Sequence, residues 1–314
     1  MHSIQRIAFT AIMLLVFSGT GYAENKIQIF VSIVPQKYFV QQIGKDLVHV
    51  QIMVQPGASP ATYEPKPRQM AELSKSRIYF AIGVPFEASW MDKIAAANPN
   101  LKVIHTDHGI EKLAMAAHHH DASAEEHHEG DHDHRKDDHH GEAEDDLDHH
   151  EHAGLDPHIW LSPPLVKQQA RTILVALQEA DPAHQSVFEA NFQEFAARID
   201  HLDADLKKIF AGKTGLQFMV FHPSWGYFAH AYGLKQVPIE IEGKDPKPAE
   251  LQELIEHARN EGIKVIFAQP QFSDKSARLV AKEIGGQVVY ADPLSEDWMS
   301  NLMAVANKFK AALK

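Results

Sequence analysis

The stretch PAHQSVFEANFQEFAARIDHLDADLKKIFAG, residues 182–212, separates two parts of the chain that share one sequence pattern. Its apolar residues recur at alternating steps of four and three, which places them in one stripe of an amphipathic helix. They are Phe188, Phe192, Phe195, Ile199, Leu202, Leu206 and Ile209. Asp181 is the expected N-cap, Pro182 the first helical residue and Gly212 the end. Roughly 29 residues give a length on the order of 45 Å, so we expect this helix to pack along a two-lobed core rather than in a coiled coil.

Short strand-like runs alternate with helical patterns on both sides of this helix. The strand-like runs are residues 27–34, 48–54, 78–82 and 101–106 before it, and 216–221, 236–241, 265–268 and 288–290 after it. The helical patterns are residues 67–76, 87–97, 248–260 and 274–284, with a last helix from about residue 296. This alternation predicts β-α-β units. The predicted fold is therefore α/β, with two lobes, each a four-stranded mainly parallel sheet with flanking helices, joined by one long helix.

Residues 1–23 have the order of a secretory signal. Arg6 is followed by an apolar run over residues 7–17 and by the small-residue end Gly21-Tyr22-Ala23. The run is shorter than the about 20 residues that span a bilayer, so we expect a cleaved signal and export.

The chain has no cysteine, so disulfides, thiolate zinc sites and the acylated cysteine of lipoproteins are excluded. We expect a periplasmic protein without a lipid anchor. The expected domains are an N-terminal lobe at 24–180, the linking helix at 181–212 and a C-terminal lobe at 213–314.

One segment, residues 118–152, carries most of the unusual composition. Between Asp121 and Glu151 lie 14 Asp and Glu against Arg135 and Lys136, a net charge of −12 that equals the net charge of the whole chain. The remainder therefore sums to zero, and no basic surface is left for nucleic acid. With almost no apolar residues the segment cannot form a core, so we expect a mobile loop.

This segment also matches the H-E-x-x-H pattern of metalloproteases, at residues 128–132. Such a site needs a helix that presents both histidines on one face, and Gly130 interrupts the pattern in a segment without apolar support. We interpret the segment instead as a weak, accessory metal collector, or alternatively as a solvated spacer. Its histidines are His118, His119, His120, His127, His128, His132, His134, His139, His140, His149, His150 and His152.

Three other residues stand where a fixed metal site is expected. His158 lies in LDPHIWLSP (155–163), His222 in FMVFHPSWGY (218–227) and Asp292 in VVYADPL (288–294). His222 and Asp292 follow strand-like runs, and ligands of open α/β sheets bind beyond the carboxyl ends of the strands. Four other histidines outside this segment are interpreted as structural residues: His105, His108, His201 and His257.

These stretches resemble the periplasmic metal-binding subunits of ABC importers, specifically their high-affinity zinc-uptake (ZnuA-type) branch. The resemblance covers the mature chain and includes PGASPATYEPKP, DPHIWLSP, FHPSWGYFAHAYGL, IEGKDPKPAEL and ADPL. It implies two lobes joined by a long helix, with His158, His222 and Asp292 as metal ligands. Manganese-binding relatives carry Glu where His222 stands, so the imidazole favours zinc.

Ala61 departs from the family pattern, which has histidine at this position of PGASPATYEPKP. A methyl group cannot bind a metal, so the site lacks one protein ligand. Water, Glu64, Tyr63 or a histidine of the loop could complete it, and the sequence does not choose among them.

The resulting interpretation is a monomeric zinc receptor, not an enzyme, that delivers Zn²⁺ to an ABC permease in the inner membrane. Alternatives are a manganese- or iron-specific member of the family, a zinc-dependent hydrolase, and a metal-buffering or adhesion protein.

Removing residues 118–152 is expected to leave the fold and the tight site intact, because the segment adds nothing to a core, while weaker sites disappear. Calorimetric zinc titration of the truncated protein measures this. Loss of the tight site would mean that a loop histidine is an inner ligand.

Overall fold

The computed structural model describes residues 26–115, 154–241 and 244–313. The predicted signal (1–23), the histidine-rich segment (118–152) and its H-E-x-x-H match lie outside the described residues. Within the described ranges no helix combines the length and apolar character needed to cross a membrane.

The N-terminal lobe contains a sheet in the order β2-β1-β3-β4, and all its strand pairs are parallel. Its strands are β1 (Ile27–Val31), β2 (Val48–Ile52), β3 (Ile78–Ala81) and β4 (Lys102–His105). The elements between them are α1 (Val34–Gly44), the 3₁₀ turn η1 (Lys45–Leu47), α2 (Pro67–Leu73) and α3 (Pro85–Ala97).

The C-terminal lobe repeats this topology in a second parallel sheet, ordered β6-β5-β7-β8. Its strands are β5 (Gln217–Val220), β6 (Lys235–Pro238), β7 (Val265–Ala268) and β8 (Gln287–Tyr290). Its helices are α6 (Gly226–Tyr232), α7 (Pro248–Asn260), α8 (Lys275–Glu283) and α9 (Trp298–Ala312). The predicted fold class is confirmed, and the two sheets are wholly parallel within the described residues.

Prolines fix the starts of many helices. The first turns of α1, α2, α3, α7 and α4 (Pro163–Ala180) contain a proline. Proline suits this position because its φ is already helical and no N–H is lost from the ladder.

The first predicted strand, 27–34, extends too far, because β1 ends at Val31. The Gln36 side chain accepts from the Ser32 and Ile33 N–H groups at 3.0 and 3.3 Å, which ends the strand and begins α1.

The long helix links the lobes as predicted, but its start differs. Pro182–His184 form the 3₁₀ turn η3, and α5 runs over Gln185–Phe210. Asp181 does not cap the helix with its side chain; its carboxylate instead lies 2.6 Å from His184 Nδ1. Of the predicted stripe, Ile209 is half-buried and Phe210 is buried in its place at the last turn. Packing of the stripe in the core, rather than in a coiled coil, is confirmed.

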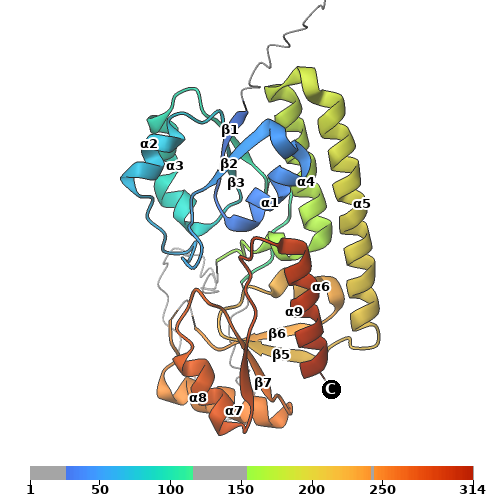
Figure 1. Ribbon diagram of the computed structural model, residues 1–314. Coiled ribbons are helices and arrows are strands. Elements are labelled where there is room, and N and C mark those ends of the chain that lie inside the picture. Colours follow the sequence, from blue (N-terminus) through green and yellow to red (C-terminus); the bar gives the residue numbers. More distant parts are fainter. Residues whose placement is uncertain (1–25, 116–153, 242–243, 314) are drawn as a thin grey trace, which may run out of the picture.

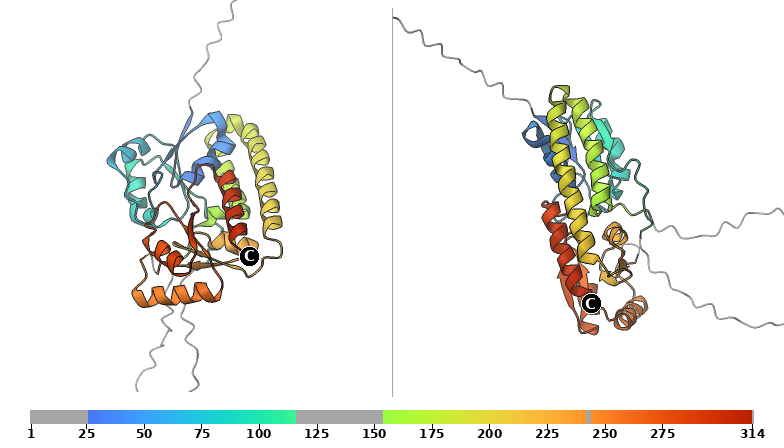
Figure 2. Two further views of the ribbon diagram at one scale, coloured as in Figure 1. Left: turned by 60° about the horizontal axis from the view of Figure 1, so that its bottom comes forward. Right: turned by 90° about the vertical axis from the view of Figure 1, so that its right-hand side faces the viewer.

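Helix α5 runs along one side of the molecule, past both lobes, with α4 beside its first half (Figure 1). It packs against α1 and α4 in the N-terminal lobe and against α6 and α9 in the other lobe. The side view in Figure 2 shows α4, α5 and α9 as one layer of helices on this side of both sheets. One core cluster therefore includes residues of both lobes, and the carboxyl ends of the strands are held in a fixed relation.

Candidate metal centre

His158 directly follows Pro157, and its ring is held by a carboxylate. Asp156 Oδ1 accepts from the His158 backbone N–H at 2.9 Å and lies 2.6 Å from its Nδ1. Asp156 and His158 are both buried. The 3₁₀ turn η2 (Ile159–Leu161) then leads into α4, so the imidazole stands on a short, fully packed segment.

His222 is held in the same manner at the carboxyl end of β5. Glu240 Oε1, just beyond β6, lies 2.6 Å from His222 Nδ1. The Gln269 side chain accepts from the His222 N–H and donates to its carbonyl, at 3.1 and 2.7 Å. Burial lowers the pKa of His222 below its ordinary value, against the opposing effect of Glu240, so the ring stays neutral to a lower pH than an ordinary imidazole does.

The free ring nitrogens of the two histidines face each other. Carboxylates only accept hydrogen bonds, so both Nδ1 atoms carry the proton and both Nε2 atoms present lone pairs. The Nε2 atoms are 3.3 Å apart. A tetrahedral Zn²⁺ at about 2.0–2.1 Å from two imidazole nitrogens holds them about 3.3–3.4 Å apart. The pair has the spacing of two zinc ligands, and each ring has the carboxylate partner that zinc-bound histidine usually has.

A cavity of about 80 Å³ contains both histidines. Typical pockets for organic ligands are about 300–1,000 Å³, so this one suits an ion and little else. Its other lining residues include Ala61, Met115 and Leu294, and among the described residues that line it the two histidines are the only ionisable ones. Trp160 lies beside His158, and Phe272 stacks on His222 with ring centroids 4.5 Å apart.

Asp292 stands at the end of β8, as predicted, but outside this pair. Its Oδ1 accepts from Gln271 Nε2 at 2.7 Å and from the Leu294 N–H at 2.9 Å. The neighbouring Pro293 and Leu294 line the cavity, and Asp292 itself does not. Among the described residues no group of three or more His, Asp or Glu side chains is arranged to hold a metal. The structure thus brings two of the three predicted ligands together.

Gln271 adds an oxygen to the cavity wall. With Nε2 donating to Asp292, its Oε1 is the acceptor, and this atom is buried without a hydrogen-bond partner. The cavity therefore presents imidazole nitrogens and a carboxamide oxygen, all of them electron-pair donors, which is the chemistry that a cation requires.

The Ala61 segment reaches the same cavity. Ser59, Pro60 and Ala61 line it, in the connection between β2 and α2. The sequence offered Glu64 and Tyr63 as candidates for the missing ligand. Glu64 is exposed and does not line the cavity, and the Tyr63 hydroxyl donates to Gln69 Oε1 at 2.8 Å.

The other histidines with a structural interpretation do not line this cavity. His257 Nε2 lies 3.0 Å from Gln217 Oε1, and His201 Nε2 lies 3.4 Å from Asp205 Oδ2. His105 and His108 are exposed.

Sequence reasoning missed Asp156 and Glu240, the carboxylates that orient the two rings. Asp156 lies two residues before His158, a spacing at which an aspartate readily accepts from the following backbone. Glu240 sits between Ile239 and Ile241 at the end of a strand-like run, and a carboxylate in that setting was a usable signal.

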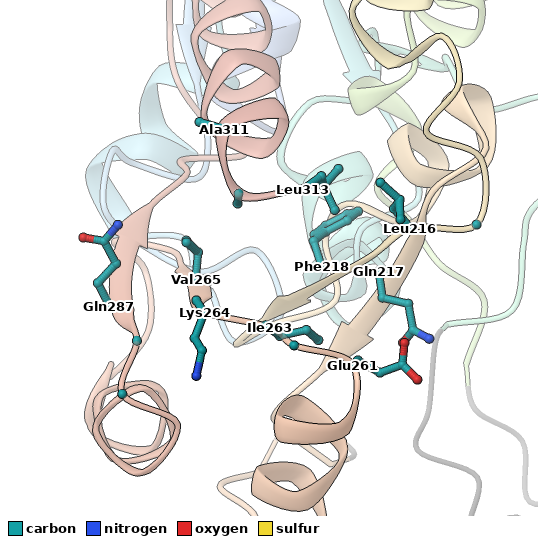
Figure 3. Close-up of a pocket in the computed structure, with 15 residues that line it drawn as sticks. Leu216, Gln217, Phe218, Glu261, Ile263, Lys264, Val265, Gln287, Ala311 and Leu313 are labelled. Carbon is teal, nitrogen blue, oxygen red and sulfur yellow. The ribbon is translucent and has the colours of Figure 1, made fainter.

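A second cavity, of about 530 Å³, opens at the opposite edge of the C-terminal sheet. Figure 3 shows it near the end of α9, with Gln217, Lys264 and Gln287 around it. None of the described residues that line it is a histidine, and Lys264 Nζ donates to the Ile284 carbonyl at 2.6 Å. Being on the amino-terminal edge of the strands, it is separate from the histidine pair.

The two α/β lobes and the opposed imidazoles define a two-lobed metal-binding protein. Comparison with known proteins identifies the kind. The family model of the periplasmic zinc-uptake complex component A (ZnuA) matches residues 29–312, and the chain belongs to this family. It is a family of binding proteins of zinc-uptake systems and not of enzymes.

Solved structures agree in both fold and sequence. A crystal structure of ZnuA is 41% identical, with a TM-score of 0.79 over 92% of this chain and 100% of that chain. A zinc-bound ZnuA variant lacking residues 138–173 is 41% identical, with a TM-score of 0.79 over 92% of this chain and 99% of that one.

More distant relatives carry related descriptions. The high-affinity zinc uptake system protein ZnuA of Bacillus subtilis (strain 168) is 28% identical, over 84% of this chain and 77% of that protein. The laminin-binding protein Lmb of Streptococcus agalactiae, described as an adhesin with metal-transporting activity, is 19% identical with a TM-score of 0.74, over 92% of this chain and 100% of that one. At that identity the likeness concerns the fold alone.

Gly226→Ala is expected to weaken zinc binding about tenfold, as the loss of an outer-shell partner of a metal ligand typically does. A Cβ at this position would lie 2.6 Å from Asp156 Oδ2. Asp156 is 1% exposed and has no room to retreat, so it would move and turn the His158 ring. Competition titration measures the affinity.

Gly154→Ala is the matched control, because its Cβ would meet nothing within 4 Å. Equal zinc affinity of the two variants would contradict the role of Asp156.

Proposed function

We propose that this chain captures Zn²⁺ between its lobes through His158 Nε2 and His222 Nε2, with Asp292 as a further ligand, for delivery to an ABC permease. The observation that carries the proposal is the 3.3 Å separation of the two Nε2 atoms, with both Nδ1 atoms held by carboxylates. Family membership supports a role in zinc uptake, whereas the identity of the ligand residues is a proposal.

Asp292 is proposed to join the ion through Oδ2 while Oδ1 stays bound to Gln271. Its support is its place directly before Pro293 and Leu294, which line the cavity. The Trp160 indole donates to the Pro293 carbonyl at 2.8 Å, so the segment after Asp292 is tied to the segment that carries His158. Gln271 Oε1, buried and unpaired, supports a water or direct oxygen contact to the ion.

Zinc is the proposed cargo because two imidazoles and a carboxylate suit Zn²⁺, whereas Mg²⁺ and Mn²⁺ prefer oxygen ligands. The small cavity, about 80 Å³, leaves no space for an ester or peptide substrate, which argues against the hydrolase alternative. Residues 118–152 keep the proposed role of an accessory collector of metal.

Competition titration of the intact protein with Zn²⁺ tests the ligand assignment. His158→Ala and His222→Ala are each expected to lower the affinity about a hundredfold, equivalent to about 2.8 kcal/mol, and Asp292→Ala less. His257→Ala, whose ring contacts Gln217 away from the cavity, is the control. Tight binding that survives the loss of both His158 and His222 would overturn the proposal.

The pH dependence follows from competition between protons and zinc for the same lone pairs. Because burial lowers the pKa of His222, protonation of this ring weakens binding at a lower pH than it would for an ordinary imidazole. Affinity is therefore expected to hold from pH 8 to 7 and to fall steadily toward pH 5. An affinity independent of pH between 7 and 5 would exclude imidazole ligands.

Ala61→His is expected to add a protein ligand, because Ala61 already lines the cavity. An imidazole in place of water should raise the affinity about ten- to a hundredfold, or roughly 1.4–2.8 kcal/mol. Titration, with X-ray absorption to count nitrogen neighbours, measures the gain in proteins with and without residues 118–152. No change in either quantity in the truncated protein would mean that another residue fills the position.

A further inference from the structure

A short antiparallel stem joins the two ends of the segment 116–153 immediately beside the histidine pair. Ala114 and Leu155 form its bridge. The Met115 N–H donates to the Gly154 carbonyl at 2.9 Å, and the Asp156 N–H donates to the Leu113 carbonyl at 2.8 Å. Met115 also lines the cavity of His158 and His222. The stem therefore ends at Asp156, the residue that orients His158.

One side chain of the other lobe fastens both strands of this stem. Tyr227, on α6, is 4% exposed. Its hydroxyl accepts from the Leu113 N–H at 2.9 Å and donates to the Asp156 carbonyl at 2.9 Å. Burial raises the pKa of Tyr227 to about 12, so the hydroxyl keeps the proton that it donates at every pH at which the protein is used.

The two hydrogen bonds connect the segments of both histidines. Helix α6 begins four residues after His222, and the Asp156 carbonyl that Tyr227 fixes belongs to the residue whose carboxylate holds the His158 ring at 2.6 Å. Sliding or rotation of the stem against α6 would change the distance between the two Nε2 atoms. The Tyr227 hydroxyl opposes both movements because it bonds to one strand as acceptor and to the other as donor.

We infer that Tyr227 is a positioning residue for metal binding: its hydroxyl clamps the stem of segment 116–153 across the lobes and thereby holds His158 at ligating distance from His222. The inference rests on the proposed function of the histidine pair. It assigns to this phenol a role in zinc affinity beyond its contribution to the fold.

Tyr232 offers a matched comparison on the same helix. It is buried, and its hydroxyl lies 3.1 Å from Asp203 Oδ1 of α5. Its ring stacks on Phe210, with centroids 5.8 Å apart. Each Tyr→Phe substitution removes one hydroxyl from a buried ring on α6. Only the Tyr227 hydroxyl contacts the stem.

The experiment compares Tyr227→Phe, Tyr232→Phe and the wild type in the full chain. Zn²⁺ affinity is measured by competition titration, Co²⁺ coordination by the visible absorption of the cobalt-loaded protein, and the fold by the melting temperature of the metal-free protein. Tyr227→Phe is expected to bind zinc about tenfold more weakly, at the low end of the about 10–100-fold effect of outer-shell partners, with an altered cobalt spectrum. Tyr232→Phe is expected to bind as the wild type does, whatever its melting temperature.

Wild-type zinc affinity and an unchanged cobalt spectrum in Tyr227→Phe would overturn the inference alone. A wild-type protein without tight zinc binding would overturn the proposed function and this inference with it. If Tyr227→Phe fails to fold, amide hydrogen exchange of the wild-type protein tests the clamp instead. Slower exchange of the Leu113 and Asp156 amides on adding zinc supports the clamp, and exchange that zinc does not change overturns it.

Discussion

The feature on which the proposed metal site depends is a pair of imidazole nitrogens, the Nε2 atoms of His158 and His222, that face each other at 3.3 Å. The pair persists because Asp156 and Glu240 fix each ring through Nδ1. Both carboxylates are buried, so the hydrogen bonds are made where water does not compete.

The scaffold makes this pair possible by keeping two separate sheets in one relation. Helix α5 packs on both lobes, and tryptophan side chains join them beside the site. Trp160 donates to the Pro293 carbonyl, and Trp298 donates to the Trp160 carbonyl at 2.6 Å. Each indole N–H is satisfied by a backbone group of a distant segment, so these contacts fix position as well as bury area.

The two sheets share a strand order but not the chemistry of their carboxyl edges. At the N-terminal edge the buried Glu87 accepts from the Ile82 and Gly83 N–H groups and from the Ser32 hydroxyl. Burial raises the pKa of Glu87, and Lys112 Nζ lies 2.6 Å from Asp107 at the same edge. At the C-terminal edge Gln271 Oε1 is buried without a hydrogen-bond partner, and His222 Nε2 faces His158 Nε2.

The sequence by itself determined the α/β class, the strands of the two sheets and the long helix, because these depend on local periodicity, which is visible in a single chain. That His158 and His222 share one site was implied by the family resemblance. Only the tertiary structure decided what surrounds the imidazoles. The partner of His222 is 18 residues away, the Tyr227 contact with Asp156 spans 71 residues, and the histidines are 64 residues apart. Asp292 illustrates the same limit: the sequence placed it at a strand end, but its bonds to Gln271 and Leu294 arise from packing. Periodicity fixes which face of an element is buried, whereas distances between elements depend on how all the buried faces fit together.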